Sequence, residues 1–407
     1  MTRSILFLTL LSLTSGAAAG QLLPAGSQDL VPQRLSATQP KAVRALPSEE
    51  LHYAWALEAD ANLSTTAPHT AESREFWADH DAADWQSGIR IHTTQPGALV
   101  RISPIGGQRS ALQPSELIVE RDGRRYGNAS ALSSVASASD LADGAVPFPE
   151  GTTAFRLNAS LGAGAFTLQA PMADGRYLIH VFEPDSNSVL KLQSGRDAQL
   201  AGDALTIRAQ FEESGRTTQL DRLAGVLTAP DGRSVDLAFD RQRDGSYLAS
   251  VPAPTAADVG GPVPWEVHAF GAKGEVLRDA KTAVGITNPV ARLSGSVEHL
   301  PVRAHGNNVV LRFGVEAASA GRYQLTGTLW GTNATGQLVP VATAQSAKLL
   351  NGNDGIELQF LDAVIGPAAV RAPYELRDLR LQNQADMGLL ERRELAWRSD
   401  TSSDSDK

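Results

Sequence analysis

The chain has 407 residues, a formal net charge of -9 at pH 7 and no cysteine. The lack of cysteine excludes disulfides, thiolate metal sites and a lipid-modified cysteine, so folding depends on apolar cores alone. The acidic balance, without a basic stripe interleaved with aromatic residues, excludes nucleic acid as an expected partner. Since a domain usually takes roughly 100 to 200 residues, the length predicts about two to four domains.

The first residues have the pattern of a secretory signal peptide. Arg3 supplies a positive charge, residues 5–13 form a short apolar run, and small residues follow. The A-x-A sequence that ends at Ala19 predicts cleavage after that residue, so residues 1–19 are the predicted signal peptide. A bilayer span needs about 20 apolar residues, and no later run is long enough. We therefore expect an exported protein, periplasmic or extracellular, without a membrane span.

Residues 20–47 are rich in Gln, Pro, Ser and Ala and show no sustained period, which predicts a flexible or loosely docked arm. A β-rich N-terminal module is predicted over residues 48–190. At its start Tyr53, Trp55 and Leu57 alternate with other residues as they would on one face of a strand. A helix over the same residues remains an alternative.

Further along this module, Ile89–Thr93 and Leu99–Ile102 lie on either side of a Pro-Gly pair, a pattern typical of a hairpin. Ala129–Leu141 is the best candidate for a short helix, although its many serines lower the helix propensity.

Two immunoglobulin-like β-sandwiches are predicted next, over residues 191–289 and 290–398. Short alternating runs recur at roughly 8 to 12 residues, which is typical of this architecture. Trp265 and Trp330 each lie in such a run, and an inward position is favoured over stacking on a sugar. The last residues, 399–407, are polar and charged and predict a disordered tail.

Three segments carry a family resemblance: Phe76–Trp77, Gly88–Ala98 and Ala372–Leu379. They resemble the secreted bacterial domain-of-unknown-function 4785 family, and the resemblance extends over most of the mature chain. It implies an N-terminal module followed by two immunoglobulin-like modules, and export by a Gram-negative bacterium with the type II secretion pathway as a candidate route. It implies no reaction and defines no catalytic residues.

The motifs of common enzymes are missing from the sequence. It has no H-E-x-x-H, no G-x-S-x-G and no phosphate-binding P-loop, so we predict no catalytic residues and no cofactor. The densest polar cluster lies between Glu72 and Asp84. Its candidate metal ligands are Asp79, His80, Asp81 and Asp84. Because these residues lack the fixed spacing of a known ligand set, a solvated acidic turn beside a core tryptophan is favoured.

The sequence thus predicts a mainly β, secreted, non-enzymatic, multi-domain binding or interaction protein. Its expected partner is another protein or a cell-surface glycan. The alternative is a hydrolase, or a module accessory to one, with its site in the N-terminal region.

Overall fold

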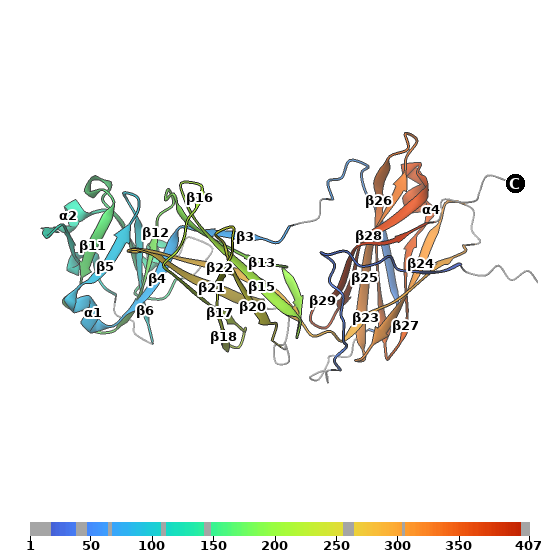
Figure 1. Cartoon of the computed structure of the whole chain (residues 1–407), viewed down its shortest axis with the longest axis horizontal. Coiled ribbons are helices and arrows are strands. Elements are labelled where there is room, and N and C mark those ends of the chain that lie inside the picture. The colour runs from blue at the N-terminus through green and yellow to red at the C-terminus, as the bar shows by residue number, and fades with distance from the viewer. Residues whose placement is uncertain are drawn as a thin grey trace, which may run out of the picture. The chain divides into compact units, whose positions relative to one another are not determined.

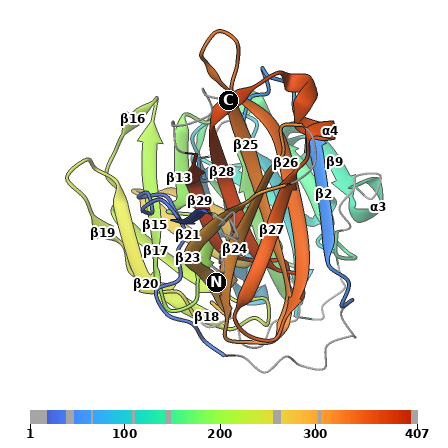
Figure 2. The ribbon, with the colours of Figure 1, turned by 90° about the vertical axis from the view of Figure 1, so that its right-hand side faces the viewer.

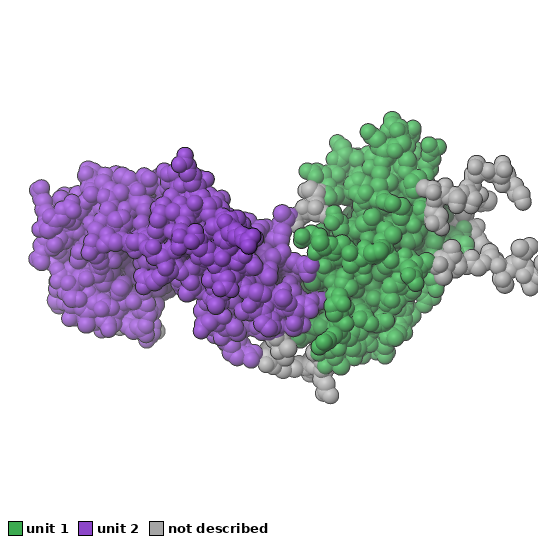
Figure 3. All heavy atoms as spheres, in the orientation of Figure 1, with its two compact units in different colours: residues 1–66, 255–262, 287–407 green, residues 67–254, 263–286 purple. Residues whose placement is uncertain are grey.

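A computed structural model of the protein describes residues 18–37, 47–63, 67–106, 111–141, 148–254, 264–302 and 306–399. Strands take up 58% of the residues and helices 8%, which confirms the mainly β fold class. The chain forms two compact units, coloured separately in Figure 3. Unit 1 contains the described residues of 1–66 and 287–407, and unit 2 those of 67–254 and 263–286.

Unit 2 is built on one long antiparallel sheet (Figure 1). In spatial order its strands are β18 (Ser234–Leu237), β17 (Arg222–Thr228), β21 (Trp265–Lys273), β22 (Val276–Thr287), β4 (Glu75–His80), β12 (Arg176–Phe182), β6 (Leu99–Ile105), β10 (Thr153–Leu157) and β9 (Leu132–Ser137), with β14 (Ala198–Leu200) paired to β22. Along β12, Tyr177, Ile179 and Val181 are buried while the residues between them are less so. This period of two places one apolar face against a second sheet.

Two smaller sheets cover the long one and enclose two apolar cores. The first sheet consists of β5 (Ile89–Thr93), β11 (Gly164–Gln169), β7 (Ile118–Arg121) and β8 (Arg124–Tyr126). The second consists of β19 (Asp240–Arg241), β20 (Tyr247–Pro252), β15 (Ala204–Glu213), β13 (Ser188–Ser194) and β3 (Thr70–Ser73), with β16 (Arg216–Thr217) paired to β15. The predicted hairpin of β5 and β6 is wrong, because these two strands belong to different sheets.

A buried ion pair joins the predicted N-terminal module to the middle sandwich. Arg278 of β22 is 0% exposed, and its Nη2 lies 2.6 Å from Oε2 of Glu183, which is 1% exposed. The same guanidinium donates to the Ser188 carbonyl and to the Thr94 hydroxyl. Since β22 also pairs with β4, the two predicted modules form parts of one compact unit.

Unit 1 is a sandwich of two antiparallel sheets, seen in Figure 2. The first sheet contains β1 (Ala18–Gln21), β23 (Ala291–Leu300), β24 (Val309–Ala317) and β27 (Asp354–Phe360). The second contains β2 (Leu51–Ala56), β26 (Leu338–Leu350), β25 (Gly321–Thr332), β28 (Arg371–Asn383) and β29 (Gly388–Arg398). Their facing apolar side chains, such as Phe313 and Leu325, form one core.

The N-terminal segment is docked on the C-terminal sandwich, which excludes the flexible alternative for its described residues. Gly20 and Gln21 pair with β23, Leu30 is 3% exposed and bridges to Arg392, and the Asp29 carboxylate accepts the Glu394 N–H at 2.7 Å. These contacts fix residues 20–37 on the sandwich because both sheets offer unpaired backbone groups at their edges. Residues 38–46 lie outside the described residues.

The predicted boundaries at 48 and 190 also need correction. β2 joins the sheet of the C-terminal sandwich, β3 joins the middle sandwich, and β13 crosses residue 190. Strand pairing is set by free edges in space and not by chain order, so linear boundaries fail here. The predicted leader falls outside the described residues except for Ala18 and Ala19 in β1, and the predicted tail does so except for Ser399.

Helices are short in the described part of the chain. They are α1 (Ala82–Ser87), α2 (Asn128–Ala131), α3 (Ala138–Leu141) and α4 (Asp362–Ile365), with 3-10 turns η1 (Pro114–Glu116), η2 (Ala159–Leu161) and η3 (Gly366–Ala368). The predicted helix over 129–141 is therefore present only at its ends. Its middle is strand β9, because pairing with β10 outweighs the weak helix propensity of this serine-rich stretch. No helix among the described residues has the length and hydropathy that crossing a membrane requires.

Candidate functional site

The structure assigns local roles to the four candidate metal ligands. Asp79 forms an ion pair with Arg176, and Asp81 is the N-cap of α1, its carboxylate accepting the Asp84 N–H at 3.0 Å. His80 Nδ1 lies 3.3 Å from the second carboxylate oxygen of Asp84. His80 and Asp84 therefore meet, but within the described ranges no three His, Asp or Glu side chains are placed to hold one metal ion.

The two tryptophans beside this segment have opposite environments. Trp85 is 0% exposed in the core, whereas Trp77, a residue of β4, lies on the face of the long sheet that points away from that core. The Trp77 ring stacks on His180 at 4.7 Å, meets His268 edge-on at 5.8 Å, and has the Lys281 ammonium 5.4 Å from its centroid. These contacts engage the ring within the protein, so this cluster strengthens the junction of β4 with its neighbours.

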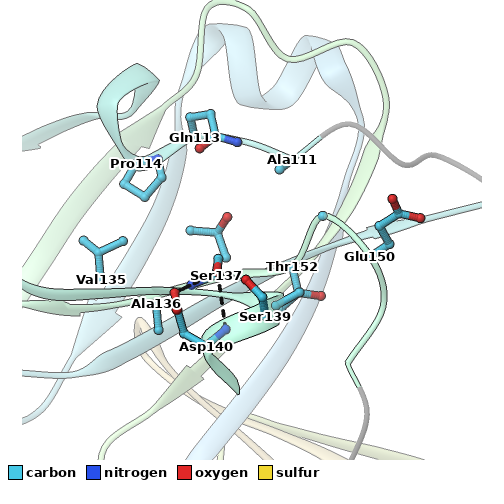
Figure 4. A pocket seen from close by; sticks show the side chains of 13 residues that line it. Ala111, Gln113, Pro114, Val135, Ala136, Ser137, Ser139, Asp140, Glu150 and Thr152 are labelled. Atoms are coloured by element: carbon cyan, nitrogen blue, oxygen red, sulfur yellow. Dashed lines mark hydrogen bonds between the residues drawn. The ribbon is translucent and has the colours of Figure 1, made fainter. Parts of the chain in front are cut away.

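A shallow pocket of about 400 Å³ lies beside β9 (Figure 4). Its polar groups bond mainly to one another: Ser137 donates through its N–H and its hydroxyl to the Asp140 carboxylate, at 2.8 and 2.7 Å. The backbone hydrogen bond from Ser137 lowers the pKa of Asp140, and the hydroxyl hydrogen bond adds to this effect. The arrangement is that of a capped turn.

Exposed aromatic rings lie instead on β2, the edge strand of the five-stranded sheet in unit 1. Tyr53 is 61% exposed and Trp55 is 46% exposed. The alternation that predicted a strand here is confirmed, and it orients both rings away from the core because the small Ala54 between them packs inward. We call the solvent side of this sheet the outer face.

The register shows what shares the outer face with these rings, because directly paired residues project from the same side of a sheet. The first row is Tyr53, Gln345, Thr326, Arg380 and Arg392. The second row is Trp55, Thr343, Thr328, Arg377 and Leu395. Each row begins with an aromatic ring at one edge. The first row continues through one amide and one hydroxyl to two arginines, and the second continues through two hydroxyls to one arginine and a leucine.

The middle of the outer face is organised by side-chain hydrogen bonds. Gln345 and Gln384 both donate to the amide oxygen of Gln324, each at 3.0 Å, and the Thr328 and Thr343 hydroxyls are 3.1 Å apart. These bonds restrict the side-chain rotamers before any ligand arrives. Gln324 and Thr328 are each only 8% exposed, so the groups that can meet a ligand are the partly exposed Thr343 and Gln345.

Two carboxylates are shared among the arginines at the far edge. The Glu375 carboxylate accepts from the Nε of Arg377 and from the Nε of Arg398, both at 2.8 Å. The carboxylate of Asp378 accepts from Arg380 at 3.0 Å and from Arg392 at 2.9 Å.

These contacts affect the ionisation of Glu375. Burial by itself would raise the pKa of Glu375, but the hydrogen bonds and charges of Arg377 and Arg398 outweigh it and hold this pKa below its ordinary value. The carboxylate is therefore ionised near neutral pH and keeps both guanidiniums oriented.

Of the two sandwich tryptophans predicted to point inward, one is confirmed. Trp265 is 4% exposed and belongs to a core, whereas Trp330 is half-buried beneath the guanidinium of Arg377, 4.5 Å from its ring centroid. The alternation of the strand around Trp330 was visible in the sequence. The sequence did not show which side of the strand faced the second sheet, because that depends on the neighbouring strands.

The fold and this site define a multi-domain β-sandwich protein with an exposed face of aromatic, amide and arginine side chains. Residues 42–183 match the model of the N-terminal domain of DUF4785, a domain of unknown function, and residues 291–398 match its C-terminal domain. The chain belongs to the DUF4785 family. No curated protein matches it.

Solved structures support the fold. A DUF4785 family protein of Legionella pneumophila is 19% identical, covers 91% of this chain and 99% of its own, and superposes with a TM-score of 0.73. Salmonella alpha-2-macroglobulin is 13% identical over 80% of this chain and 20% of its own, with a TM-score of 0.29. The Escherichia coli adhesin FdeC is 14% identical over 81% of this chain and 99% of its own, with a TM-score of 0.20. The first similarity shows the fold, and the other two are too distant to support an argument.

Proposed function

We propose that this chain is an exported, non-enzymatic binding protein of a Gram-negative bacterium, and that its outer face binds a glycan. The observation that carries the proposal is the pair of exposed rings, Tyr53 and Trp55, in register with rows of amides and hydroxyls. The signal-peptide pattern at the N-terminus supports export.

The chemistry of the outer face suits a sugar chain. Large exposed rings are unfavourable in water and mark contact surfaces, and an aromatic ring offers a flat apolar area for the C–H face of a sugar. Tyr53 and Trp55 are two residues apart on one strand, so their Cα atoms are separated by about 7 Å. Beyond them, Gln345 and Thr343 supply donors and acceptors that match sugar hydroxyls.

The size of the outer face favours an extended ligand. Five strands at about 4.8 Å span about 19 Å from the first strand to the last, and the polar rows continue across that width. A ligand of several units could contact a ring, an amide and an arginine at once. A single small molecule could not.

The test compares the Tyr53→Ala, Trp55→Ala double variant with the unmodified protein on an array of immobilised polysaccharides, followed by calorimetry on the best binder. Losing both rings should weaken binding at least about tenfold, which corresponds to about 1.4 kcal/mol. Phe270→Ala is the matched control, because Phe270 is an aromatic residue of unit 2 with 39% exposure. Circular dichroism checks that each variant folds.

Two results would overturn the proposal. The first is that no polysaccharide on the array binds the unmodified protein. The second is that a polysaccharide binds with the same affinity to the folded double variant.

A further inference from the structure

The arginine edge of the outer face has an excess of positive charge. Two carboxylates meet four guanidiniums there. The members are Glu375 with Arg377 and Arg398, and Asp378 with Arg380 and Arg392. Each carboxylate can neutralise one guanidinium, and Glu394, exposed on β29 opposite Asp378, adds a third carboxylate to this edge, so four guanidiniums face three carboxylates.

Around Glu375 the acid lies deeper than its bases, whereas the Asp378 side chain, 36% exposed, is more exposed than that of Arg392 at 26%. The Glu375 side chain is 7% exposed, while those of Arg377, Arg380 and Arg398 are 38%, 47% and 54% exposed. A buried carboxylate that binds the inner nitrogens of a guanidinium leaves its other N–H groups available, since each guanidinium has five donors. The buried carboxylate therefore fixes the orientation of the exposed guanidiniums, and their remaining N–H groups face solvent.

The backbone at Asp378 supports this arrangement. Asp378 has φ +50°, in the left-handed region that few residues other than glycine adopt, and the strand has a bulge between Leu376 and Arg377. The bulge and this conformation together place the Asp378 carboxylate between Arg380 and Arg392. Backbone strain of this kind is found more often at binding sites than elsewhere in a fold.

Three of the four arginines lie in the same rows as the exposed rings, and Arg398 lies outside both rows, opposite Glu375. Arg380 is three strands away from Tyr53 in the first row, a separation of about 14 Å. Arg377 holds the corresponding place in the row of Trp55. One extended ligand can therefore reach a ring and a guanidinium together.

We propose that the ligand of the outer face is an acidic polysaccharide whose uronate carboxylates bind the four arginines. This inference rests on the proposed glycan-binding function and narrows its ligand class. Guanidinium and carboxylate match in geometry, as the internal pairs of the cluster already show, and the excess of positive charge needs an anion. The rings at the other edge pack against the apolar faces of the sugars.

The experiment measures binding of the full-length mature protein to three probes: polygalacturonate, neutral dextran and dextran sulfate. The test variant is R380Q/R398Q, in which glutamine retains hydrogen-bond donors but lacks the charge. The matched control is R208Q, because Arg208 of unit 2 also has 47% side-chain exposure and an ion pair, to Asp244. Thermal melts verify folding, and R380Q alone replaces the double variant if the latter fails to fold.

We expect polygalacturonate to bind the unmodified protein more tightly than dextran does, with an affinity that falls as salt is raised. The R380Q/R398Q variant should lose at least about tenfold in affinity for polygalacturonate and most of the salt dependence, while R208Q should change neither. R380K should recover only part of the affinity, since an ammonium lacks the planar fork.

The outcomes separate the inference from the proposed function. Equal binding of dextran and polygalacturonate, lost in the Tyr53→Ala, Trp55→Ala variant, would overturn the inference and leave glycan binding intact. Equal affinity for dextran sulfate and polygalacturonate would overturn the preference for carboxylates. Unchanged polygalacturonate binding in folded R380Q/R398Q would overturn the role of the arginines. Binding to none of the three, and to nothing on the array, would overturn both proposals.

Discussion

Removing one partner of the buried pair between Arg278 and Glu183 should destabilise unit 2 severely. Both side chains are 0% exposed, their closest atoms are 2.6 Å apart, and the guanidinium also donates to the Ser188 carbonyl of β13 and to the Thr94 hydroxyl. In Arg278→Met the Glu183 carboxyl group would stay buried without its partner, and breaking a buried pair in this way typically costs about 3 to 5 kcal/mol. For a unit of this size, that corresponds to a fall in Tm of about 6 to 20 °C.

A double-mutant cycle distinguishes the contribution of this ion pair to stability from general damage to the core. Glu183→Gln retains an acceptor for the N–H groups of Thr94 and Gln95, which Glu183 Oε1 now accepts at 2.6 and 2.9 Å. The double variant should therefore lose less stability than the sum of the two single variants. Urea unfolding followed by tryptophan fluorescence gives each free energy of unfolding. A cost below about 1 kcal/mol for Arg278→Met, or strict additivity, would refute the argument.

Three further predictions concern single positions. Trp265→Ala should cost about 3 to 5 kcal/mol in urea unfolding, because it empties a large core volume, and a cost under about 1 kcal/mol would contradict the buried position. The Ser246 hydroxyl lowers the pKa of Asp244 to about 2, and the hydrogen bond from the Ser246 N–H adds to this effect. The ionised Asp244 should therefore stabilise the folded state above the ordinary pKa of an aspartate, and this stabilisation should be lost as the pH falls through about 2. An NMR titration should find that midpoint, and Ser246→Ala should raise it toward the ordinary value. Mass spectrometry of the exported protein should find Gly20 as the first residue, and a mature chain that still starts at Met1 would contradict the predicted cleavage.

The fold class could be predicted from the local pattern of the sequence. Alternating apolar residues, such as those from Ala204 to Phe211, predict strands because side chains project to opposite faces with a period of two, and β15 follows that pattern. This signal is local, so it can be read before the fold is known. The same alternation predicted inward positions for both Trp265 and Trp330, and only Trp265 is buried, because alternation does not show which face meets the core.

The candidate site was predictable only in part. The sequence indicated Tyr53 and Trp55 as one face of a strand, but whether that face met a core or solvent depended on β26, about 290 residues later. The segment with Asp79 and Asp84 drew attention because its charges are close in sequence, and the structure uses them for a helix cap and ion pairs. Charged residues that are close in the sequence do not necessarily converge on one site in space.

Tertiary structure alone decided which distant residues meet. Glu183 and Arg278 are 95 residues apart, and Tyr53 shares a row with Arg380, yet neither pairing has a local signature. Strands of similar pattern can pair with many partners, and the choice is made by the free energy of closing a particular core and satisfying a particular sheet edge. Those terms depend on the assembled sandwich as a whole, which is why the alternation predicted the strands while the folded unit determined the face they present.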